Sequence, residues 1–273
     1  MKKIVIEKVN PSHPDKIADR IGGALVDYAY SVQESPKVAV EVLIGHGNCN
    51  IIVESSVTFT DEIVQPIVDR IAGEGFKLNL ISVPQDVHLA KNQEGSIKCG
   101  DNGIFTCKPL TDTEMEITKI AQWVYDKYPT DGKYILDGIN DKLIVCQSHC
   151  DSQKLKKELE EEYPQYEIVV NPLGDWEGGM DTDTGCTNRK LGSDLGRGVS
   201  GGGVNAKGLT LCDVSATIYF WLKAQETGKE YNVCCAIGDT EIGGVPYEEI
   251  VKVAGEYINS LGGFEKFSEW GVW

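Results

Sequence analysis

The residue types best suited to chemistry gather in a glycine-rich stretch, residues 171–213. It reads NPLGDWEGGMDTDTGCTNRK and then LGSDLGRGVSGGGVNAKGLTLCD, and no helix or strand period fits it. Its charged side chains include Asp181, Asp183, Arg189, Lys190, Lys207 and Asp213. Glycines let backbone amides approach a ligand, and amides with cations and carboxylates suit a polyphosphate and its metal ion. The sequence therefore predicts a polyphosphate site; a long surface loop or flexible linker is the alternative.

A second candidate site lies at residues 10–16, NPSHPDK. Apolar residues at positions 17, 21, 25 and 28 predict a helix that begins near Pro14, with Ser12 or His13 as its N-cap. His13, Asp15 and Lys16 would then crowd a helix N-terminus, which attracts anions. A ligand site is one interpretation, and a simple helix cap is the other.

Two apolar runs, Val38–Ile44 and Ile51–Val57, flank the turn sequence GHGNCN and predict a hairpin. If Ile44 faces Ile51, then Glu41 faces Glu54, and like charges directly opposed are unfavourable. The pairing makes physical sense if a metal ion or a substrate ammonium lies nearby. In another register, one of the two glutamates would be solvated.

The elements that must position these residues alternate along the chain. Strands are expected at 3–9, 134–137, 142–147, 166–171 and 233–238, and helices at 60–76, 111–128, 152–163, 209–225 and 247–261. The Thr111-x-x-Glu114 capping box opens one helix, and residues 77–109 look irregular. Hairpin-plus-helix blocks near 38–76, 133–163 and 209–261 predict an α+β fold, with helices on one face of small mixed sheets. Similarity between the blocks is too weak to predict a sequence repeat.

Composition narrows the classes of partner. The chain has 273 residues, 41% of them hydrophobic, and a formal net charge of −16. This acidity argues against nucleic acid or an anionic membrane as partner. No signal peptide and no membrane-spanning run is evident, so we expect a cytoplasmic protein whose nine cysteines are reduced thiols. A zinc site formed by Cys146, His149 and Cys150 is the alternative for three of these residues.

Taken in order, the motifs resemble those of the methionine adenosyltransferases (S-adenosylmethionine synthetases). HPDK at 13–16 resembles the family's GHPDK, Val40-Glu41 its VACE, GDNG at 100–103 its GDQG, and Asp131-Gly132-Lys133 its D-x-K. NPLG at 171–174 resembles NPTGRF, and residues 183–190 resemble GDCGLTGRK. Residues 201–213 resemble GGGAFSGKDPSKVD, and CAIG at 235–238 resembles YAIG. The ordered set covers nearly the whole chain and is specific.

The resemblance implies three small α/β domains of mixed sheets and helices around a pseudo-threefold. The expected blocks are 10–108, then 1–9 with 109–172, and 173–273. It further implies a homodimer or dimer of dimers with active sites at the subunit interface. The implied reaction joins ATP and L-methionine into S-adenosylmethionine and then cleaves tripolyphosphate to phosphate and pyrophosphate, with Mg²⁺ and K⁺.

The resemblance also implies roles for single residues. ATP would contact His13, Asp101, Asp131, Lys133, Trp176, Asp183, Arg189, Lys190, Val204 and Lys207, of which His13, Lys133 and Arg189 would be catalytic. Methionine would contact Glu54, Gln93 and Asp183. Mg²⁺ would bind Asp15 and Asp213, and K⁺ would bind Glu41.

The chain departs from the family pattern at several positions. The mobile loop before GDQG is short, Leu211 replaces a lysine, Asp175 replaces the arginine of NPTGRF, and Trp176 replaces its phenylalanine. These changes leave two alternatives: an adenosyltransferase for another thioether, and a catalytically weak or silent nucleotide-binding homologue that acts as a regulatory subunit.

Overall fold

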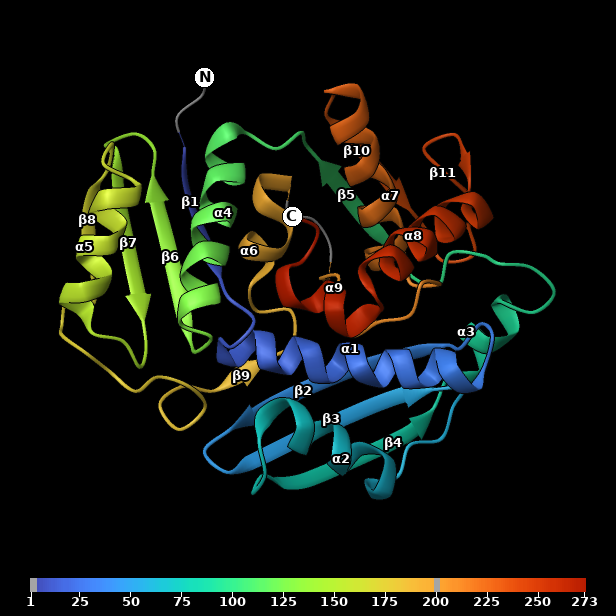
Figure 1. The fold of residues 1–273 in the computed structure, drawn as a ribbon. Helices are drawn as coiled ribbons and strands as arrows, with labels where there is room; N and C mark the ends of the chain where they lie inside the picture. The colour runs from blue at the N-terminus through green and yellow to red at the C-terminus, as the bar shows by residue number, and fades with distance from the viewer. Residues whose placement is uncertain (1–3, 199–201) are drawn as a thin grey trace.

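Three sheet-and-helix units build the protein, whose residues 4–198 and 202–273 are described by a computed structural model (Figure 1). Its strands are β1 (Val5–Val9), β2 (Val38–Gly45), β3 (Asn48–Ser55), β4 (Lys77–Pro84), β5 (Gly103–Cys107), β6 (Gly132–Asp137), β7 (Lys142–Gln147), β8 (Glu167–Val170), β9 (Gly185–Cys186), β10 (Tyr231–Cys235), β11 (Glu241–Ile242) and β12 (Val245–Pro246). Its helices are α1 (Pro14–Val32), α2 (Asp61–Ala72), α3 (Val87–Asn92), α4 (Asp112–Lys127), α5 (Ser152–Glu162), α6 (Leu191–Leu195), the 3₁₀ turn η1 (Gly196–Gly198), α7 (Cys212–Thr227), α8 (Tyr247–Leu261) and α9 (Phe264–Trp270). Lys3 and Gly201, which belong to expected elements, lie outside the described residues.

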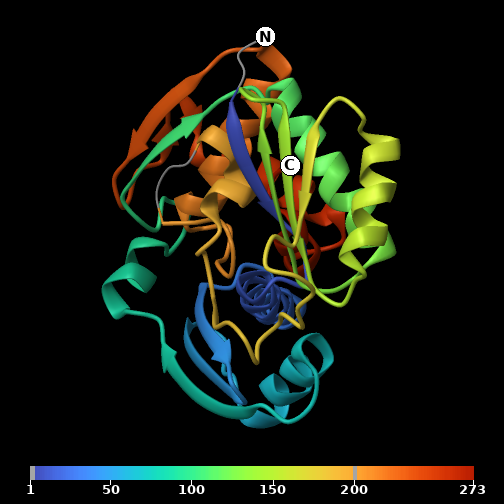
Figure 2. The same cartoon turned by 90° about the vertical axis from the view of Figure 1, so that its left-hand side faces the viewer.

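The first unit is a four-stranded sheet in the order β4-β3-β2-β9. The hairpin β2–β3 is antiparallel, as predicted, and β4 pairs in parallel with β3. Helices α1 and α2 bury one face of this sheet, where residues such as Ile21, Ile44 and Val68 form the largest hydrophobic core. Figure 2 views α1 end-on above the curved strands. The expected helix across Pro66 forms as α2 and continues through that proline.

The other face of this sheet carries apolar side chains into solvent. Leu43, Ile52, Ile81 and Val83 are 44%, 46%, 48% and 37% exposed. Ile52 pairs with Glu41 on one side and Ile81 on the other, so these side chains share one row across three strands. Glu54 and Val83 pair with each other two residues further along the strands, so their side chains lie on the same face. The sheet therefore presents a mixed apolar and acidic surface.

The predicted register of the hairpin is wrong by two residues. Ile44 pairs with Cys49, and Glu54 pairs with Ala39, so Glu41 does not face Glu54. The cause is a two-residue turn at His46 and Gly47, both with positive φ (50° and 73°), which keeps residues 45 and 48 in the ladder.

The second unit is the sheet β1-β6-β7-β8, covered by α4 and α5. It combines β1, residues 5–9, with residues 112–170 from much later in the chain. The Thr111 capping box forms at the start of α4. The order of elements β6-β7-α5-β8, with β8 parallel to β7, repeats that of β2-β3-α2-β4. The two units thus share the hairpin-plus-helix order predicted for 38–76 and 133–163, and each adds one parallel strand after its helix.

The third unit pairs β5 with β10 and packs α7 and α8 against them. Strand β5 belongs to the expected first block, yet its hydrogen-bonded partner lies 128 positions later, at the Phe105–Val233 pair. Residues 77–109 are also more regular than expected, since they contain β4, α3 and β5. No helix in the described part of the chain is long and apolar enough to cross a membrane.

Candidate active site

The N-terminus of α1 holds the first group of candidate residues. His13 is the N-cap, and its Nδ1 accepts a hydrogen bond from the Asp15 amide at 3.1 Å. Asp15 is buried, and its Oδ1 accepts the Cys186 amide at 2.8 Å. One turn further along α1, Asp19 Oδ1 accepts the Asn188 amide at 2.7 Å. Two carboxylates one helical turn apart therefore anchor residues 186–188 of the glycine-rich stretch against α1.

Two cations from that stretch meet the buried carboxylate. Lys190 Nζ lies 3.1 Å from Asp15 Oδ2, and Arg189 lies 3.5 Å from Asp15 Oδ1. Asp15 Oδ2 nevertheless accepts no hydrogen bond. Burial and the Lys190 charge lower the pKa of His13 to about 4, against the opposing charges of Asp15 and Asp183. His13 is therefore neutral at pH 7.

The second unit contributes Asp131 and Lys133 from the start of β6. Asp131 Oδ2 accepts the Gly179 amide at 2.9 Å. Burial, together with the nearby charges of Asp183 and Asp15, raises the pKa of Asp131 to about 6 against the hydrogen bond from Gly179. Lys133 pairs with Glu7 at 2.9 Å and is close enough to His13 to lower its pKa. We call this set the α1 cluster: His13, Asp15, Asp131, Lys133, Asp183, Arg189 and Lys190.

An aromatic side chain lies beside the α1 cluster. Trp176 donates from Nε1 to Asn171 Oδ1 at 3.1 Å, which fixes the plane of its ring. Its ring contacts Gly178, where an added Cβ would lie 2.9 Å from Cζ3 and 3.0 Å from Asp131 Oδ2. Trp176 and Asn171 line a largely apolar cavity of about 360 Å³. A flat hydrophobic group could stack there next to the cluster.

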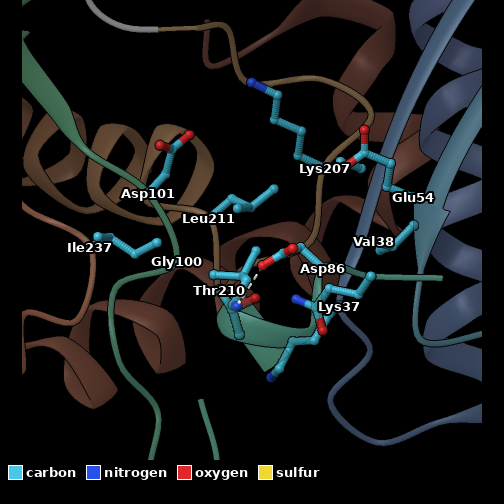
Figure 3. A pocket seen from close by; sticks show the side chains of 13 residues that line it. Lys37, Val38, Glu54, Asp86, Gly100, Asp101, Lys207, Thr210, Leu211 and Ile237 are labelled. Carbon is cyan, nitrogen blue, oxygen red and sulfur yellow. Dashed lines mark hydrogen bonds between the residues drawn. The ribbon is translucent and has the colours of Figure 1, made fainter. Parts of the chain in front are cut away.

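The second group lines a cavity of about 390 Å³ between the first and third units, here called the β3 pocket. Figure 3 shows Glu54 and Lys207 on one side of it and Asp101 and Ile237 on the other. The remaining lining residues are Lys37, Val38, Ala39, Gln85, Asp86, Leu89, Gly100, Thr210 and Leu211. Charged groups of both signs with apolar walls suit a zwitterionic ligand that has a hydrophobic part.

Lys207 joins the pocket to the start of α7. Its Nζ lies 2.8 Å from Asp213 Oδ2 and also donates to the Gly202 carbonyl at 3.1 Å. Gly202 in turn donates its amide to Asp213 Oδ1 at 3.2 Å. Residue 213 is the second residue of α7, so its carboxylate lies in the favourable first turn.

Gln93 lies behind Gly100, one of the residues that line the β3 pocket. It is 9% exposed, and neither atom of its side-chain amide has a hydrogen-bond partner. Its Nε2 lies so close to Gly100 that a Cβ there would come within 2.5 Å. A buried amide without partners is costly, so a ligand in the pocket would satisfy it.

The two groups of residues are separate within one chain. Cys186 pairs with Leu43 on β2, whereas Lys207 bridges to Ala39 four residues away on the same strand. Four residues of strand span about 13 Å. The described contacts therefore do not bring Asp15 and Asp213 together in one chain.

Several residues that were singled out from the sequence lie outside both groups. Glu41 is exposed on the open sheet face and accepts a hydrogen bond from Thr187 Oγ1 at 2.5 Å. Val204 is fully buried in the largest core. Asp175, which replaces an arginine of the family pattern, accepts hydrogen bonds from the amide and hydroxyl of Ser152 and so supports the start of α5.

The alternative zinc site at Cys146, His149 and Cys150 does not form. His149 pairs with Glu177 at 3.1 Å, and Cys150 donates to the Gln147 carbonyl. Sequence reasoning also missed Lys37, Asp86 and Thr210 as pocket residues. Asp86 gives a signal in the sequence, because its side chain caps α3 by accepting the amides of His88 and Leu89.

Comparison with known proteins identifies this architecture. The fold is that of the S-adenosylmethionine synthetases: it superposes on a solved structure of an unusual S-adenosylmethionine synthetase from Campylobacter jejuni with a TM-score of 0.69 and 18% identity. That match covers 89% of this chain and 80% of the other. Residues 3–90 match the family model of the S-adenosylmethionine synthetase N-terminal domain.

Sequence relatives agree with the fold. An S-adenosylmethionine synthase from Sulfurovum sp. is 27% identical over 267 residues, which covers 77% of this chain and 69% of the relative. One from Helicobacter pylori strain Shi470 is 32% identical over 129 residues and 41% of this chain. That match spans only 33% of the Helicobacter protein. Over these matched regions the chain is similar in sequence to S-adenosylmethionine synthetases.

Proposed function

We propose that this protein transfers the adenosyl group of ATP to the sulfur of L-methionine and then cleaves the tripolyphosphate to phosphate and pyrophosphate. One observation carries the proposal: cations, carboxylates and His13, drawn from three distant parts of the sequence, converge at the N-terminus of α1. The separate β3 pocket offers both charge signs, and the buried, unpaired amide of Gln93 lies next to its lining residue Gly100.

The reaction needs positioning and charge stabilisation rather than a base. The thioether sulfur already carries a lone pair; it attacks C5′ of ATP, a new C–S bond forms, and the C5′–O bond breaks with its electrons on tripolyphosphate. Lys133, Arg189 and Lys190 would bind that leaving group. Neutral His13 would donate a hydrogen bond to a phosphate oxygen near the breaking bond. Water then cleaves the tripolyphosphate in the same place.

The residues present suit a hard divalent cation. Mg²⁺ prefers carboxylate oxygen, and Asp15 Oδ2 is a buried carboxylate oxygen that accepts no hydrogen bond. Asp15 and Asp213 would hold Mg²⁺, which supplies electrostatic stabilisation of the phosphates when bound. Glu41 would hold K⁺. Trp176 would stack on adenine, alongside contacts from Asp101, Asp131 and the backbone at Val204.

Methionine would occupy the β3 pocket. Glu54, with Asp183 of a second copy, would pair with its ammonium, and Gln93 would use its unpaired amide to bind the amino acid. Leu211 and Ile237 provide an apolar wall for the thioether chain. Lys207 would bind a phosphate of the same ATP.

We further propose that a complete site needs two copies of the chain. Asp15 and Asp213 belong to groups about 13 Å apart along β2 in one chain, although one metal ion would need both. The exposed sheet face with Leu43, Ile52 and Ile81 could bury itself against its own copy, as in an isologous dimer. A dimer of dimers would place two such pairs together. We further expect the protein to act in the cytoplasm, where ATP and L-methionine would be its substrates.

The test is incubation with ATP, L-methionine, Mg²⁺ and K⁺, with S-adenosylmethionine, phosphate and pyrophosphate measured separately. The proposal expects all three products. Absence of S-adenosylmethionine while ATP still binds would favour a regulatory nucleotide-binding subunit instead. Lys133→Ala should abolish product formation, whereas Lys142→Ala, on the same sheet but paired with Glu167 at the surface, should not.

A second candidate is transfer to another thioether. Leu211 lines the β3 pocket where the family pattern has a lysine, so the pocket wall is more apolar than that pattern implies. A panel of thioethers without the amino-acid carboxylate would test it. If only methionine yields an adenosyl product, this candidate is excluded.

A further inference from the structure

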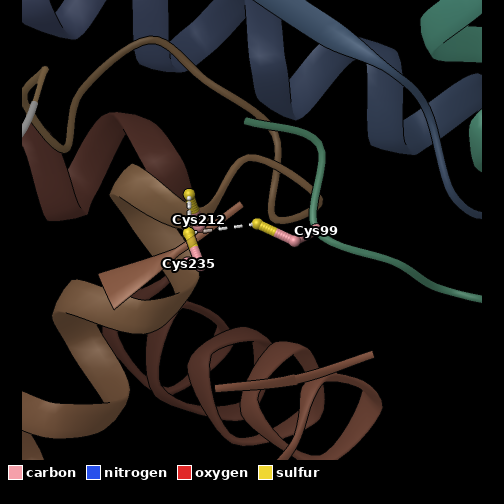
Figure 4. A group of neighbouring side chains, drawn as sticks. All are labelled: Cys99, Cys212 and Cys235. Carbon is pink, nitrogen blue, oxygen red and sulfur yellow. Dashed lines mark hydrogen bonds between the residues drawn. The ribbon is translucent and has the colours of Figure 1, made fainter. Parts of the chain in front are cut away.

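Three cysteines from distant parts of the chain bring their sulfur atoms together behind the β3 pocket. Figure 4 shows the side chains of Cys99, Cys212 and Cys235 gathered together. Their Sγ atoms all lie within 4.8 Å of one another. Cys235 Sγ lies 3.3 Å from Cys99 Sγ and 3.0 Å from Cys212 Sγ. All three side chains are buried, at 0%, 0% and 8% exposure.

A fourth donor atom faces the same point. The backbone carbonyl oxygen of Asp101 lies 3.0 Å from Cys99 Sγ and 3.5 Å from each of the other two sulfurs. The Asp101 carboxylate faces away, because this side chain lines the β3 pocket. Three sulfurs and one oxygen thus surround a common centre from four directions.

We propose that Cys99, Cys212 and Cys235 form a binding site for a thiophilic metal ion, Zn²⁺, with the Asp101 carbonyl oxygen as fourth ligand.

The dimensions fit this ion with little movement. A tetrahedral Zn²⁺ site with bonds of about 2.3 Å to sulfur separates its sulfurs by about 3.8 Å. The sulfurs described here at 3.0 and 3.3 Å would need to move apart by less than about 1 Å. Such a change lies within the reach of small rotations of the three side chains.

The chemistry favours a soft cation over a hard one. Thiolate ligands select Zn²⁺ or Cu⁺ rather than Mg²⁺ or K⁺. Binding would release the thiol protons to solvent as the three Zn–S bonds form, and no oxidant or reductant is needed. The Cys99 amide donates to the Asp239 backbone carbonyl, which fixes the backbone beside the three sulfurs. A cation would offset the negative charge of three thiolates there.

The site would join three segments that form one wall of the β3 pocket. Cys99 precedes Gly100 and Asp101, Cys212 follows Thr210 and Leu211, and Cys235 lies two residues before Ile237. Two of the cysteines also depart from the family motifs, because Cys235 stands where YAIG has tyrosine and Cys212 where KVD has valine. A bound ion would hold this wall in place of ordinary side-chain packing.

Metal binding can be tested without substrates, so the result does not depend on the proposed reaction. The full chain is reduced with a metal-free phosphine and kept in excess Mg²⁺, which occupies carboxylate sites. Co²⁺ is then added under anaerobic conditions. We expect one equivalent per chain with thiolate-to-cobalt charge-transfer absorption, which Zn²⁺ then abolishes. Absence of that absorption in the wild-type protein overturns the proposal.

Single cysteine-to-serine substitutions test which residues bind the ion. Cys99→Ser should weaken Zn²⁺ binding by more than about 100-fold in competition with a chromophoric chelator, because it removes a direct ligand. Cys107→Ser is the matched control: Cys107 is 2% exposed in the same core, with its Sγ directed at the Thr217 carbonyl. Unchanged cobalt absorption in Cys99→Ser overturns the assignment. If that variant unfolds by circular dichroism, Cys235→Ser at the more exposed corner takes its place.

A Cu⁺ titration against a bathocuproine competitor separates the two soft ions. Three thiolates alone satisfy Cu⁺, so they need no oxygen donor. Tight Cu⁺ binding together with failure of Zn²⁺ to displace cobalt would overturn both the choice of Zn²⁺ and the role of the Asp101 carbonyl. The proposal expects Zn²⁺ also to raise the melting temperature of the wild-type protein and to leave that of Cys99→Ser unchanged.

Discussion

Lys207 Nζ lies 2.8 Å from Asp213 Oδ2, so the lysine expected to bind a phosphate is paired with the carboxylate expected to bind Mg²⁺. Asp15 and Lys190 form the equivalent pair at 3.1 Å in the α1 cluster. In each pair, a polyphosphate would take the lysine as its partner and Mg²⁺ would take the carboxylate. The described structure therefore balances its buried charges internally before substrate arrives.

Asp15→Asn tests the metal role of that carboxylate. The amide oxygen can still accept the Cys186 amide, so the fold should persist while the charge is lost. We expect S-adenosylmethionine formation to fall by about 100-fold or more and to need higher Mg²⁺. Initial rates across an Mg²⁺ series measure this. Asp181→Asn, an exposed carboxylate in the same glycine-rich stretch, is the control and should retain activity.

Mixing two inactive variants tests whether the site is shared between copies. Asp15→Asn damages the α1 cluster, and Asp213→Asn damages the β3 side. A mixed dimer would have one site with both changes and one with neither. Random exchange should therefore restore about a quarter of the wild-type rate. Each variant alone serves as control, and no recovery after verified subunit exchange would contradict a shared site.

Two neighbouring glycines allow a matched test of the aromatic contact. Gly178 and Gly179 both have positive φ, 66° and 75°, so alanine at either position should cost about 1–2 kcal/mol of backbone strain. Only at 178 would the new Cβ clash, at 2.7 Å from Ser148 Cβ and 2.9 Å from Trp176 Cζ3. We expect Gly178→Ala to raise the KM for ATP at least about 10-fold.

Gly179→Ala should keep a KM close to that of the wild-type protein, since no atom lies within 4 Å of its added Cβ. Steady-state kinetics with both variants, alongside their melting curves, separate the contact from the strain. Equal effects at the two positions would argue against a role for Trp176 in binding ATP.

The buried carboxyl of Asp131 should make stability depend on pH. Its pKa rises from 3.8 to about 6 on folding, so the folded protein holds this proton more tightly than the unfolded chain. Its contribution is present in full below pH 4 and is lost as the pH rises through 6. Relative to wild type, Asp131→Asn should therefore gain about 2.4 kcal/mol of unfolding free energy between pH 4 and pH 7.

Urea unfolding of both proteins at several pH values measures this difference. His13 acts in the opposite direction, because its lowered pKa removes stability as the pH falls from 6.5 toward 4. That contribution is present in both proteins and cancels in the comparison. A difference that stays constant from pH 4 to pH 7 would show that Asp131 does not carry the proton.

The sequence correctly predicted those elements that are determined by residues close to one another in the chain. The proline start of α1, the Thr111 capping box and the alternating strands all appear as expected. Strand β4 was missed because burial alternates only over its first half, where Leu78 and Leu80 are half-buried, whereas its last four residues are all exposed. The hairpin register failed because a His-Gly turn is not among the strongest turn signals.

The candidate site shows the same limit. The order of motifs predicted the members of the α1 cluster, because each motif carries its own residue types. It did not predict that Asp15 and Asp213 lie apart in one chain, since that depends on how β9 and Lys207 pair with β2. Likewise, no spacing relates positions 99, 212 and 235, so the cysteine cluster became visible only once β5 and β10 were paired.

The open face of the first sheet has a consequence for how the protein would behave on dilution. If Leu43, Ile52 and Ile81 meet their counterparts in a second copy, then two chains must associate before any catalytic turnover is possible. Far below the dissociation constant of that pair, the rate would fall with the square of the chain concentration. The cellular abundance of the chain would then affect the total reaction rate in two ways: through the number of chains and through the fraction of them that is paired.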